Sequence, residues 1–190
     1  ERTHVKTGAR ALGIAESYVD ERSVVAGCVV RADRVVDDLC YDRWTVGGTD
    51  ATATVIDMFE DLDREDLQYL LLSGIAPAWF NVLDCHAIHA ESGLPTLSVS
   101  FEASEGLESA IREAYDDEAA VEQRLAVYRN QPARREVTVN EETVFVRSVG
   151  IADDEADAVV RAFTPEGGRP EPLRVAKLAA RAADRDLASG

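Results

Sequence analysis

The apolar segment from Leu67 to Leu72 constrains the fold of this chain more than any other part of its sequence. It is nearly all apolar and too short for an independent helix, which is typical of a strand that is covered on both faces. Ser73 and Gly74 then allow the backbone to turn, and Pro77 ends the extended run. Apolar side chains at helical spacing follow over residues 80–87. We therefore predict the central strand of an α/β sheet, a sharp turn and a helix.

The turn from Ser73 to Asn81 is the first place where we expect a functional site. In an α/β sheet, ligands bind where strands end and where the order of the strands reverses. Trp79 and Phe80 belong to this turn, and aromatic rings are the side chains that stack on nucleic-acid bases. The alternative interpretation is that the segment is only the central strand and its crossover, with both rings in the core.

The length of 190 residues suits a single domain, over residues 1–190, with a core of its own. The chain shows no run of about eighteen apolar residues and no signal-peptide pattern, so we expect neither a membrane span nor a membrane partner. The three cysteines, Cys28, Cys40 and Cys85, are an odd number at unrelated spacings. This usage favours reduced thiols and a cytoplasmic protein over a disulfide framework.

Charge is the extreme feature of the composition. The chain has 36 acidic and 20 basic residues and a net charge of −16, and its only lysines are Lys6 and Lys177. This balance is typical of proteins from a high-salt cytoplasm, so we expect a halophilic source. A net charge this negative normally argues against nucleic-acid partners. In molar salt, however, the Debye length falls to about 3 Å, so local arginines and bound metal decide whether a phosphate is attracted.

The rest of the pattern predicts the order of the other elements. Residues 11–46 are rich in β-branched and small apolar residues with short links, which indicates three strands in an antiparallel meander. Thr49 or Asp50 would cap the amphipathic helix that follows. Three strands that lead into β-α-β units give the order of a ribonuclease H-like fold, so we predict an α/β, three-layer structure with a mixed sheet. The later elements are a strand over 95–101, helices over 104–115, 118–129, 152–163 and 172–187, and a hairpin over 137–146.

Three carboxylates are candidates for a metal site. Glu16 closes an otherwise apolar strand, where a buried charge is costly unless a cation meets it. Asp50 follows two glycines at the start of a helix, and Asp84 follows the central strand. Two or three carboxylates from separate elements hold Mg²⁺ or Mn²⁺ through oxygen, and such a cation orients water and stabilises charge on a phosphoryl group. The alternatives are a strand-end glutamate in water, a plain helix cap and a solvent-facing acid.

Other patterns carry less information about chemistry. Cys85, His86 and His89 are compatible with zinc, but no second cluster supplies the missing ligands. The chain has no Gly-rich phosphate loop with Lys-Ser/Thr and no G-x-S-x-G elbow, and Ser73 has no obvious base. Three arginines near the last helix either meet phosphates or lie solvated: Arg169, Arg174 and Arg181.

Four segments stand out together: Ala11-Leu12-Gly13-Ile14-Ala15-Glu16, Val46-Gly47-Gly48-Thr49-Asp50-Ala51-Thr52, Ser73-Gly74-Ile75-Ala76 with Phe80-Asn81, and Gly168-Arg169-Pro170-Glu171-Pro172-Leu173-Arg174-Val175-Ala176. In this order they span almost the whole chain, and together they resemble an archaeal family named endonuclease dU, which is related to endonuclease V.

The resemblance implies an endonuclease V-like form of the ribonuclease H-like fold. It also implies metal-dependent cleavage of uracil-containing DNA at deoxyuridine, in the repair of deaminated DNA. Glu16 stands where endonuclease V has an aspartate at the end of the first strand, and Asp50 where it has a glutamate. These two residues would hold Mg²⁺ or Mn²⁺, with Asp84 as a further catalytic candidate. Residues implied to bind substrate are Ser73, Gly74 and Asn81 at the base, and Arg169 and Arg174 at the backbone phosphate.

The chain departs from the endonuclease V pattern at two acidic positions. The aspartate at the end of the central strand is replaced by Ser73, and the aspartate after the Arg-x-Ala segment is replaced by Lys177. One consequence would be an altered metal site that Asp84 or Glu171 completes. Another would be a module that binds nucleic acid or protein without turnover. A third possibility is an enzyme for nucleotides or small molecules that uses the same cleft.

Overall fold

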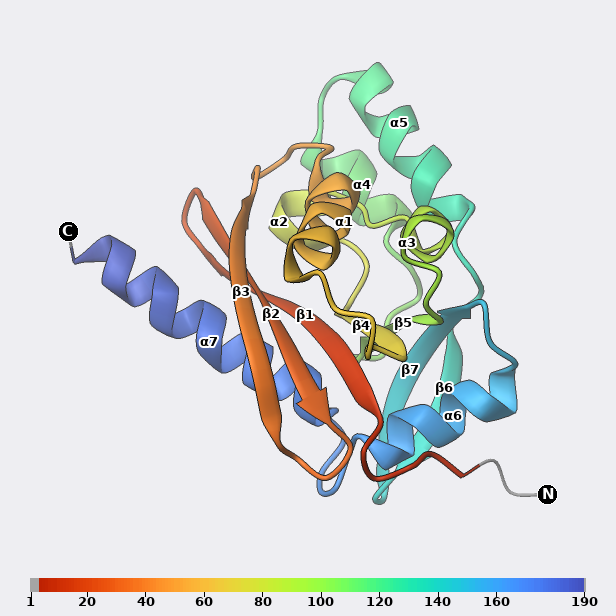
Figure 1. Ribbon diagram of the computed structural model, residues 1–190. Helices are drawn as coiled ribbons and strands as arrows, with labels where there is room; N and C mark the ends of the chain where they lie inside the picture. The colour runs from red at the N-terminus through yellow and green to blue at the C-terminus, as the bar shows by residue number, and fades with distance from the viewer. Residues whose placement is uncertain (1–3, 190) are drawn as a thin grey trace.

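The computed structural model describes residues 4–189, and a seven-stranded mixed sheet lies at its centre (Figure 1). The strand order is β3-β2-β1-β4-β5-β7-β6. The long strands β1 (Arg10–Val19), β2 (Arg22–Arg31) and β3 (Val36–Trp44) pair antiparallel in sequence order. The predicted meander is therefore confirmed.

The remaining strands make the sheet mixed. The central strand β4 (Tyr69–Ser73) runs parallel to β1 on one side and to β5 (Thr96–Ser100) on the other. The predicted hairpin forms β6 (Arg135–Val139) and β7 (Glu142–Val149), and β7 pairs antiparallel with β5. The carboxyl ends of β1, β4 and β5 consequently lie at one edge of the sheet, which is where a parallel arrangement places ligands.

Helices cover both faces of the sheet, because β4 is apolar on both. Leu70 and Leu72 face one layer and Leu71 faces the other, and all three are fully buried. On the first face lie α1 (Ala51–Leu62), α2 (Pro77–Phe80), α3 (Cys85–Ser92), α4 (Glu108–Ala114) and α5 (Glu118–Arg129). On the second lie α6 (Asp153–Ala162) and α7 (Glu171–Ala188).

Helix α7 packs directly on β1 and β2 (Figure 1). Its first turn comes so close to β1 that a Cβ atom on Gly13 would lie 2.4 Å from the carbonyl carbon of Pro172. Only glycine allows this approach, since real Cβ atoms do not come within 3 Å of a backbone atom. Gly13 therefore fixes where α7 starts relative to the end of β1.

The predicted helix over residues 80–87 is wrong. The chain forms only the short turn α2, continues without helical structure from Asn81 to Asp84, and begins α3 at Cys85. The apolar spacing misleads because its members belong to different clusters. Phe80 packs against α4 and α5, whereas Leu83 packs in the core under α1 and α3. The predicted helices over 118–129, 152–163 and 172–187 are confirmed with shifts of a few residues at most.

The described residues contain no helix that is both long enough and apolar enough to cross a membrane. All three cysteines are free thiols, as predicted. Burial raises the pKa of Cys28 to about 12, with a smaller contribution from neighbouring Cys40. These thiols are therefore protonated at neutral pH and pack as small apolar side chains.

Candidate active site at the carboxyl ends of β1 and β4

Glu16 lies on β1 just beyond the point where its pairing with β4 ends, at the Ile14–Leu72 pair. Its two carboxylate oxygens accept a hydrogen bond from the Ala78 N–H, at 3.1 and 3.2 Å, and the Ser23 hydroxyl donates to one of them. The alternative of a strand-end glutamate in water is therefore excluded. The carboxylate is partly buried and holds the turn that follows β4.

That turn has an unusual backbone. Ala78, Trp79 and Phe80 are consecutive non-glycine residues with φ of 48°, 58° and 59°. The left-handed conformation costs an L-residue about 1–2 kcal/mol, so the surrounding contacts must hold it. The Gly47 N–H donates to the Ala78 carbonyl at 2.7 Å, and the Tyr115 hydroxyl donates to the Trp79 carbonyl. We call residues 77–81 the left-handed turn.

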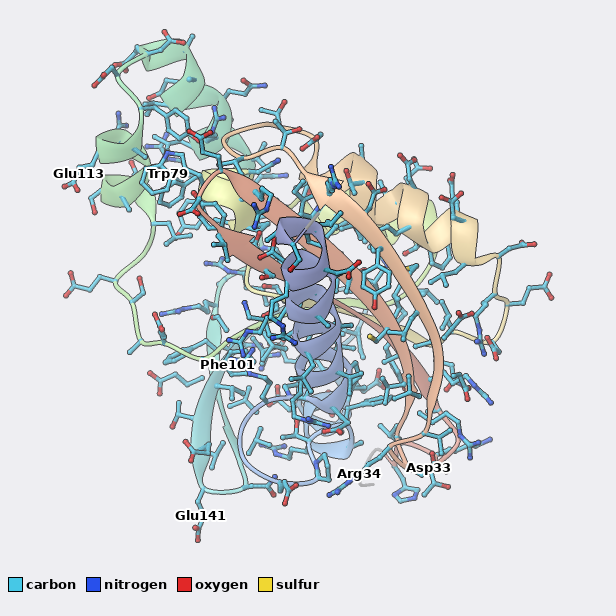
Figure 2. The ribbon with its side chains drawn as sticks, turned by 90° about the vertical axis from the view of Figure 1, so that its left-hand side faces the viewer. Asp33, Arg34, Trp79, Phe101, Glu113 and Glu141 are labelled. Carbon is cyan, nitrogen blue, oxygen red and sulfur yellow. The ribbon has the colours of Figure 1, made fainter. Side chains whose placement is uncertain are left out.

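The left-handed turn presents an aromatic side chain to solvent. Trp79 is 47% exposed, and its ring meets that of Phe80 edge to face, with centroids 5.4 Å apart. Figure 2 shows Trp79 at the periphery of the molecule, away from the sheet. The alternative that both rings are core residues therefore holds in part for Phe80 but not for Trp79.

Asp50 precedes α1 on the other side of the left-handed turn. Its carboxylate accepts from the Thr45 N–H at 3.2 Å, the Thr45 hydroxyl at 2.6 Å and the Asn81 amide at 2.7 Å. Burial raises the pKa of Asp50, but these donors outweigh burial and hold the pKa below its ordinary value. Asp50 occupies the N-cap position without a side-chain cap bond, so its carboxylate remains a charged group beside the turn.

Asn81 has a different role from the predicted contact with a base. It is 0% exposed, and its amide donates to the Thr45 carbonyl and to Asp50 while its oxygen accepts from the Ala51 N–H. All of its polar side-chain atoms are thus used inside the protein. Asn81 caps α1 and fixes the Asp50 carboxylate, so in this structure it is a positioning residue.

Asp84 serves as the N-cap of α3. Its carboxylate accepts from the N–H groups of His86 and Ala87, at 3.1 and 3.3 Å, and from the Gln131 amide at 3.2 Å. Among residues 4–189, no group of three or more His, Cys, Asp or Glu side chains is placed to hold a metal ion. A site of three acids is therefore not assembled, because Asp84 follows an extended segment and is committed to the start of α3.

The two remaining carboxylates are oxygen ligands of the kind that a hard divalent cation takes. Mg²⁺ is commonly held by one or two carboxylates, with waters and substrate phosphate completing its shell. Glu16 and Asp50 are oxygen donors that bind the same left-handed turn, one at Ala78 and the other at Asn81. Hydrogen bonds that hold a carboxylate in place are also what a metal ligand requires. The end of β4 carries the neutral side chain of Ser73 and adds no third acid.

The zinc alternative lacks support in the described structure. Burial raises the pKa of Cys85 to about 12, so it is a poor source of thiolate. One ring nitrogen of His86 bonds the Asn130 carbonyl at 3.0 Å, and one of His89 bonds the Leu94 carbonyl at 2.8 Å.

A cavity of about 260 Å³ opens between the segment before α1, the segment after the left-handed turn, and α5. Asp84 lines it, together with Gly48, Thr49, Thr52, Val82, Gln123, Arg124 and Val127. Its walls thus combine hydroxyl, amide, carboxylate and guanidinium groups with apolar side chains.

Arg124 is a site residue that the sequence prediction missed. It is only 6% exposed, donates to the carbonyls of Gly47 and Ala120, and stacks over the Tyr115 ring at 4.0 Å. Its Nε has no hydrogen-bond partner within the described chain. The signal was its place between Val121 and Leu125 on the apolar stripe of α5, where a charged residue requires a partner.

The predicted phosphate-binding arginines differ in their surroundings. The Arg169 guanidinium lies over the Phe101 ring at 4.0 Å and is partly buried. Arg174 instead donates to both carboxylate oxygens of Glu171, at 3.0 and 2.5 Å. Glu171 is thereby paired with Arg174, as is typical of neighbours on one helix face.

The family was established by comparison with known proteins. The family model described as Endonuclease dU matches residues 7–184. This chain belongs to the Endonuclease dU family. Its relatives include an UPF0215 protein of Pyrobaculum aerophilum, 34% identical over 93% of this chain and 95% of that protein. Another UPF0215 protein, from Methanopyrus kandleri, is 32% identical over 93% of this chain and 91% of that protein.

Solved structures show that the Endonuclease dU chain has the ribonuclease H-like fold of endonuclease V. A protein of unknown function from Archaeoglobus fulgidus matches with a TM-score of 0.81 and 26% identity, covering 92% of this chain and 98% of that one. Human ENDOV matches with a TM-score of 0.65 and 16% identity, over 95% and 86%. Endonuclease V of Ciona intestinalis was solved in complex with inosine-containing DNA. It matches with a TM-score of 0.66 and 14% identity, covering 94% of this chain and 87% of that one. The predicted fold class and family are confirmed.

Proposed function

We propose that this protein is a divalent-metal-dependent endonuclease that cuts DNA at deoxyuridine, in the repair of deaminated DNA. Membership of the Endonuclease dU family and the endonuclease V-like fold support a nuclease that acts on DNA. One observation carries the finer proposal. Two carboxylates, Glu16 and Asp50, accept hydrogen bonds from one left-handed turn, and the segments that follow this turn and precede α1 line a cavity with polar walls.

Glu16 and Asp50 are the residues that would hold Mg²⁺ or Mn²⁺. When bound, such an ion supplies an activated water and neutralises charge that develops on the phosphoryl group. The protein contributes a fixed geometry. Ser23 and Ala78 orient the Glu16 carboxylate, and Thr45 and Asn81 orient that of Asp50. These groups need no rearrangement when substrate arrives, which is where electrostatic catalysis gains its efficiency.

The cavity is our proposed pocket for the flipped base. Extruding a base costs a few kcal/mol and costs least for a mispaired one, which favours uracil opposite guanine. Uracil offers two carbonyl acceptors and one N–H donor, and the cavity offers Thr49, Thr52 and Gln123 as partners. The buried Arg124 also lines the cavity and adds a positive charge to its wall. Trp79 lies exposed on the neighbouring turn, where it can stack on a base beside the lesion.

The test is cleavage of a labelled oligonucleotide with one deoxyuridine, in Mn²⁺ and molar salt, by the full chain and by Glu16→Gln and Asp50→Asn. Both substitutions keep side-chain size, and each should lower the cleavage rate by about 10²- to 10³-fold. Both should also weaken Mn²⁺ binding, measured directly by electron paramagnetic resonance. Glu166→Gln, at an exposed acid of the loop before α7, is the matched control. An unchanged rate in Glu16→Gln would remove that residue from the proposed site.

A second candidate is a binding module on the same fold without turnover. The observation that favours it is the missing third acid, because Ser73 ends β4 and the described chain assembles no three-acid group. Binding of the oligonucleotide with no cleavage under any divalent metal would select this candidate.

A further inference from the structure

Three cations gather on the face of the sheet opposite the cavity. Lys177 and Arg181 are one turn apart on α7 and so lie on the same side of the helix. The Lys177 ammonium donates to the Glu16 carbonyl at 2.7 Å, where β1 has left β4. Arg169 stacks on Phe101, which directly follows β5. In Figure 2, Phe101 lies beside α7, between Trp79 at one end of the view and Arg34 at the other. We call these three residues the cation cluster.

The cation cluster lacks acidic partners. Within residues 4–189, none of its three members has a carboxylate oxygen within 4.0 Å. This is notable in a chain with 36 acidic and 20 basic residues. Two of the three acids of α7 are engaged elsewhere, since Glu171 holds Arg174 and Asp184 holds Arg22. The absence of ion pairs in the cation cluster is therefore a local property of this surface, because the composition of the chain favours acidic neighbours.

The three positive charges also act on one another. Burial lowers the pKa of the Arg169 guanidinium, and the charge of Arg181 lowers it further. Burial and the charges of Arg181 and Arg169 lower the pKa of Lys177, while the Glu16 carboxylate raises it and so offsets part of the repulsion. Like charges that are held together destabilise the folded protein unless an anion relieves them. Much of their donor capacity is free. Lys177 uses one hydrogen bond on the Glu16 carbonyl, and Arg169 presents its planar edge while Phe101 covers one face.

We propose that Arg169, Lys177 and Arg181 bind the backbone phosphates of the nucleic-acid strand whose base enters the cavity. The inference deepens the proposed function and rests on it. The strand would cross the carboxyl ends of β1 and β5, with its phosphates on the α7 side and the flipped base on the α1 side. Glu16 links the two, because its carbonyl meets Lys177 and its carboxylate meets the left-handed turn. Lys177 and Arg181 thus share the phosphate contact with Arg169. Arg174 is not part of the cluster, because Glu171 already balances its charge.

The experiment measures binding apart from cleavage. A labelled single strand, with or without deoxyuridine, is titrated with the full chain in EDTA over a series of KCl concentrations. Arg169→Gln, Lys177→Gln and Arg181→Gln should each weaken binding by about tenfold at low salt. Each should also reduce the slope of log K against log salt by about 0.7, the loss of one phosphate contact on a single strand. Both strands should respond equally, since phosphate contacts are independent of sequence.

Arg34→Gln is the control, because it removes the same charge from an exposed arginine in the turn between β2 and β3 (Figure 2). It should bind with the slope of the parent chain. Lys177→Arg and Arg181→Lys keep the charge and should keep the slope, which separates loss of charge from loss of fold. Slopes in the three glutamine variants equal to that of Arg34→Gln would overturn the inference, as would failure of the parent chain to bind either strand. Failure to cleave deoxyuridine, with the slopes changed as expected, would instead overturn the proposed function alone.

Discussion

Where β1 ends, the two faces of the sheet carry opposite charges. We call the face covered by α1 the acid side and the face covered by α7 the cation side. On the α1 side, Glu16 and Asp50 are surrounded by hydrogen-bond donors, and a strained left-handed turn lies between them. On the α7 side, regular helix carries Lys177 and Arg181 without any carboxylate partner among the described residues. The first side is rigid and built around fixed acids, which suits metal and chemistry. The second offers unsatisfied positive charge, which suits a polyanion. Under our two proposals, each side would therefore contact a different part of one substrate.

The largest effect should come from separating the two sides. Gly13→Ala places a methyl group within 2.4 Å of the Pro172 backbone, so α7 must move away from β1. We expect the free energy of unfolding to fall by about 3 kcal/mol, at the upper end for overpacked cores. Urea denaturation measures it. Gly8→Ala, where a Cβ would meet nothing within 4 Å, is the control. Equal stability of the two variants would show that α7 is not pinned at Gly13.

On the acid side, removing the buried amide of Asn81 should lower the free energy of unfolding more than removing an exposed amide does. Asn81→Ala leaves the Ala51 N–H, the Thr45 carbonyl and one bond to Asp50 unsatisfied. Unpaired buried groups cost about 1–3 kcal/mol, so we expect a loss near 2 kcal/mol in the free energy of unfolding. The exposed Asn130→Ala should cost less than about 0.5 kcal/mol. If Asn81→Ala were equally mild, Asp50 would have to be held by other groups.

The strain on the acid side can be compared directly with the regular helix on the other. Ala78 and Ala176 are both buried, but Ala78 has a φ of 48° while Ala176 lies within α7. Glycine adopts left-handed backbone freely and weakens a helix by about 0.5–1 kcal/mol. Ala176→Gly should therefore lower the free energy of unfolding by about 1 kcal/mol more than Ala78→Gly does. Thermal denaturation of the two variants decides the order, and the reverse order would mean that the turn is unstrained.

The smallest effect concerns acid pH. The pKa of Asp50 is lowered in the folded protein, so its charged form adds stability above the unfolded pKa, near 4 for an aspartate. That contribution is lost as the pH falls through the lower, folded pKa. The difference in unfolding free energy between the parent chain and Asp50→Asn should therefore be constant above about pH 4 and shrink below it. A constant difference down to pH 2 would show that Thr45 and Asn81 do not stabilise the carboxylate.

The strands and long helices were predictable because their signals are local. Leu70, Leu71 and Leu72 required a strand covered on both faces, and the apolar stripe of α7 required one exposed side. Glu16 and Asp50 became candidates for the same reason, since an acid that ends an apolar strand or begins a helix is conspicuous in the sequence. Asp84 shows the limit. Its distance from the central strand along the chain gave no indication that it would cap α3.

The sequence by itself determined the family and the mixed sheet and indicated the two candidate acids, because apolar periodicity and the segments that carry the family resemblance are properties of neighbouring residues. Only the tertiary structure decided what those acids contact. The left-handed turn at Ala78, the burial of Asn81 and Arg124, and the meeting of Lys177 with the Glu16 carbonyl all join segments far apart in the chain. In such contacts, hydrogen bonds from distant segments offset the strain of the local backbone. No pattern of neighbouring residues predicts which segments will meet.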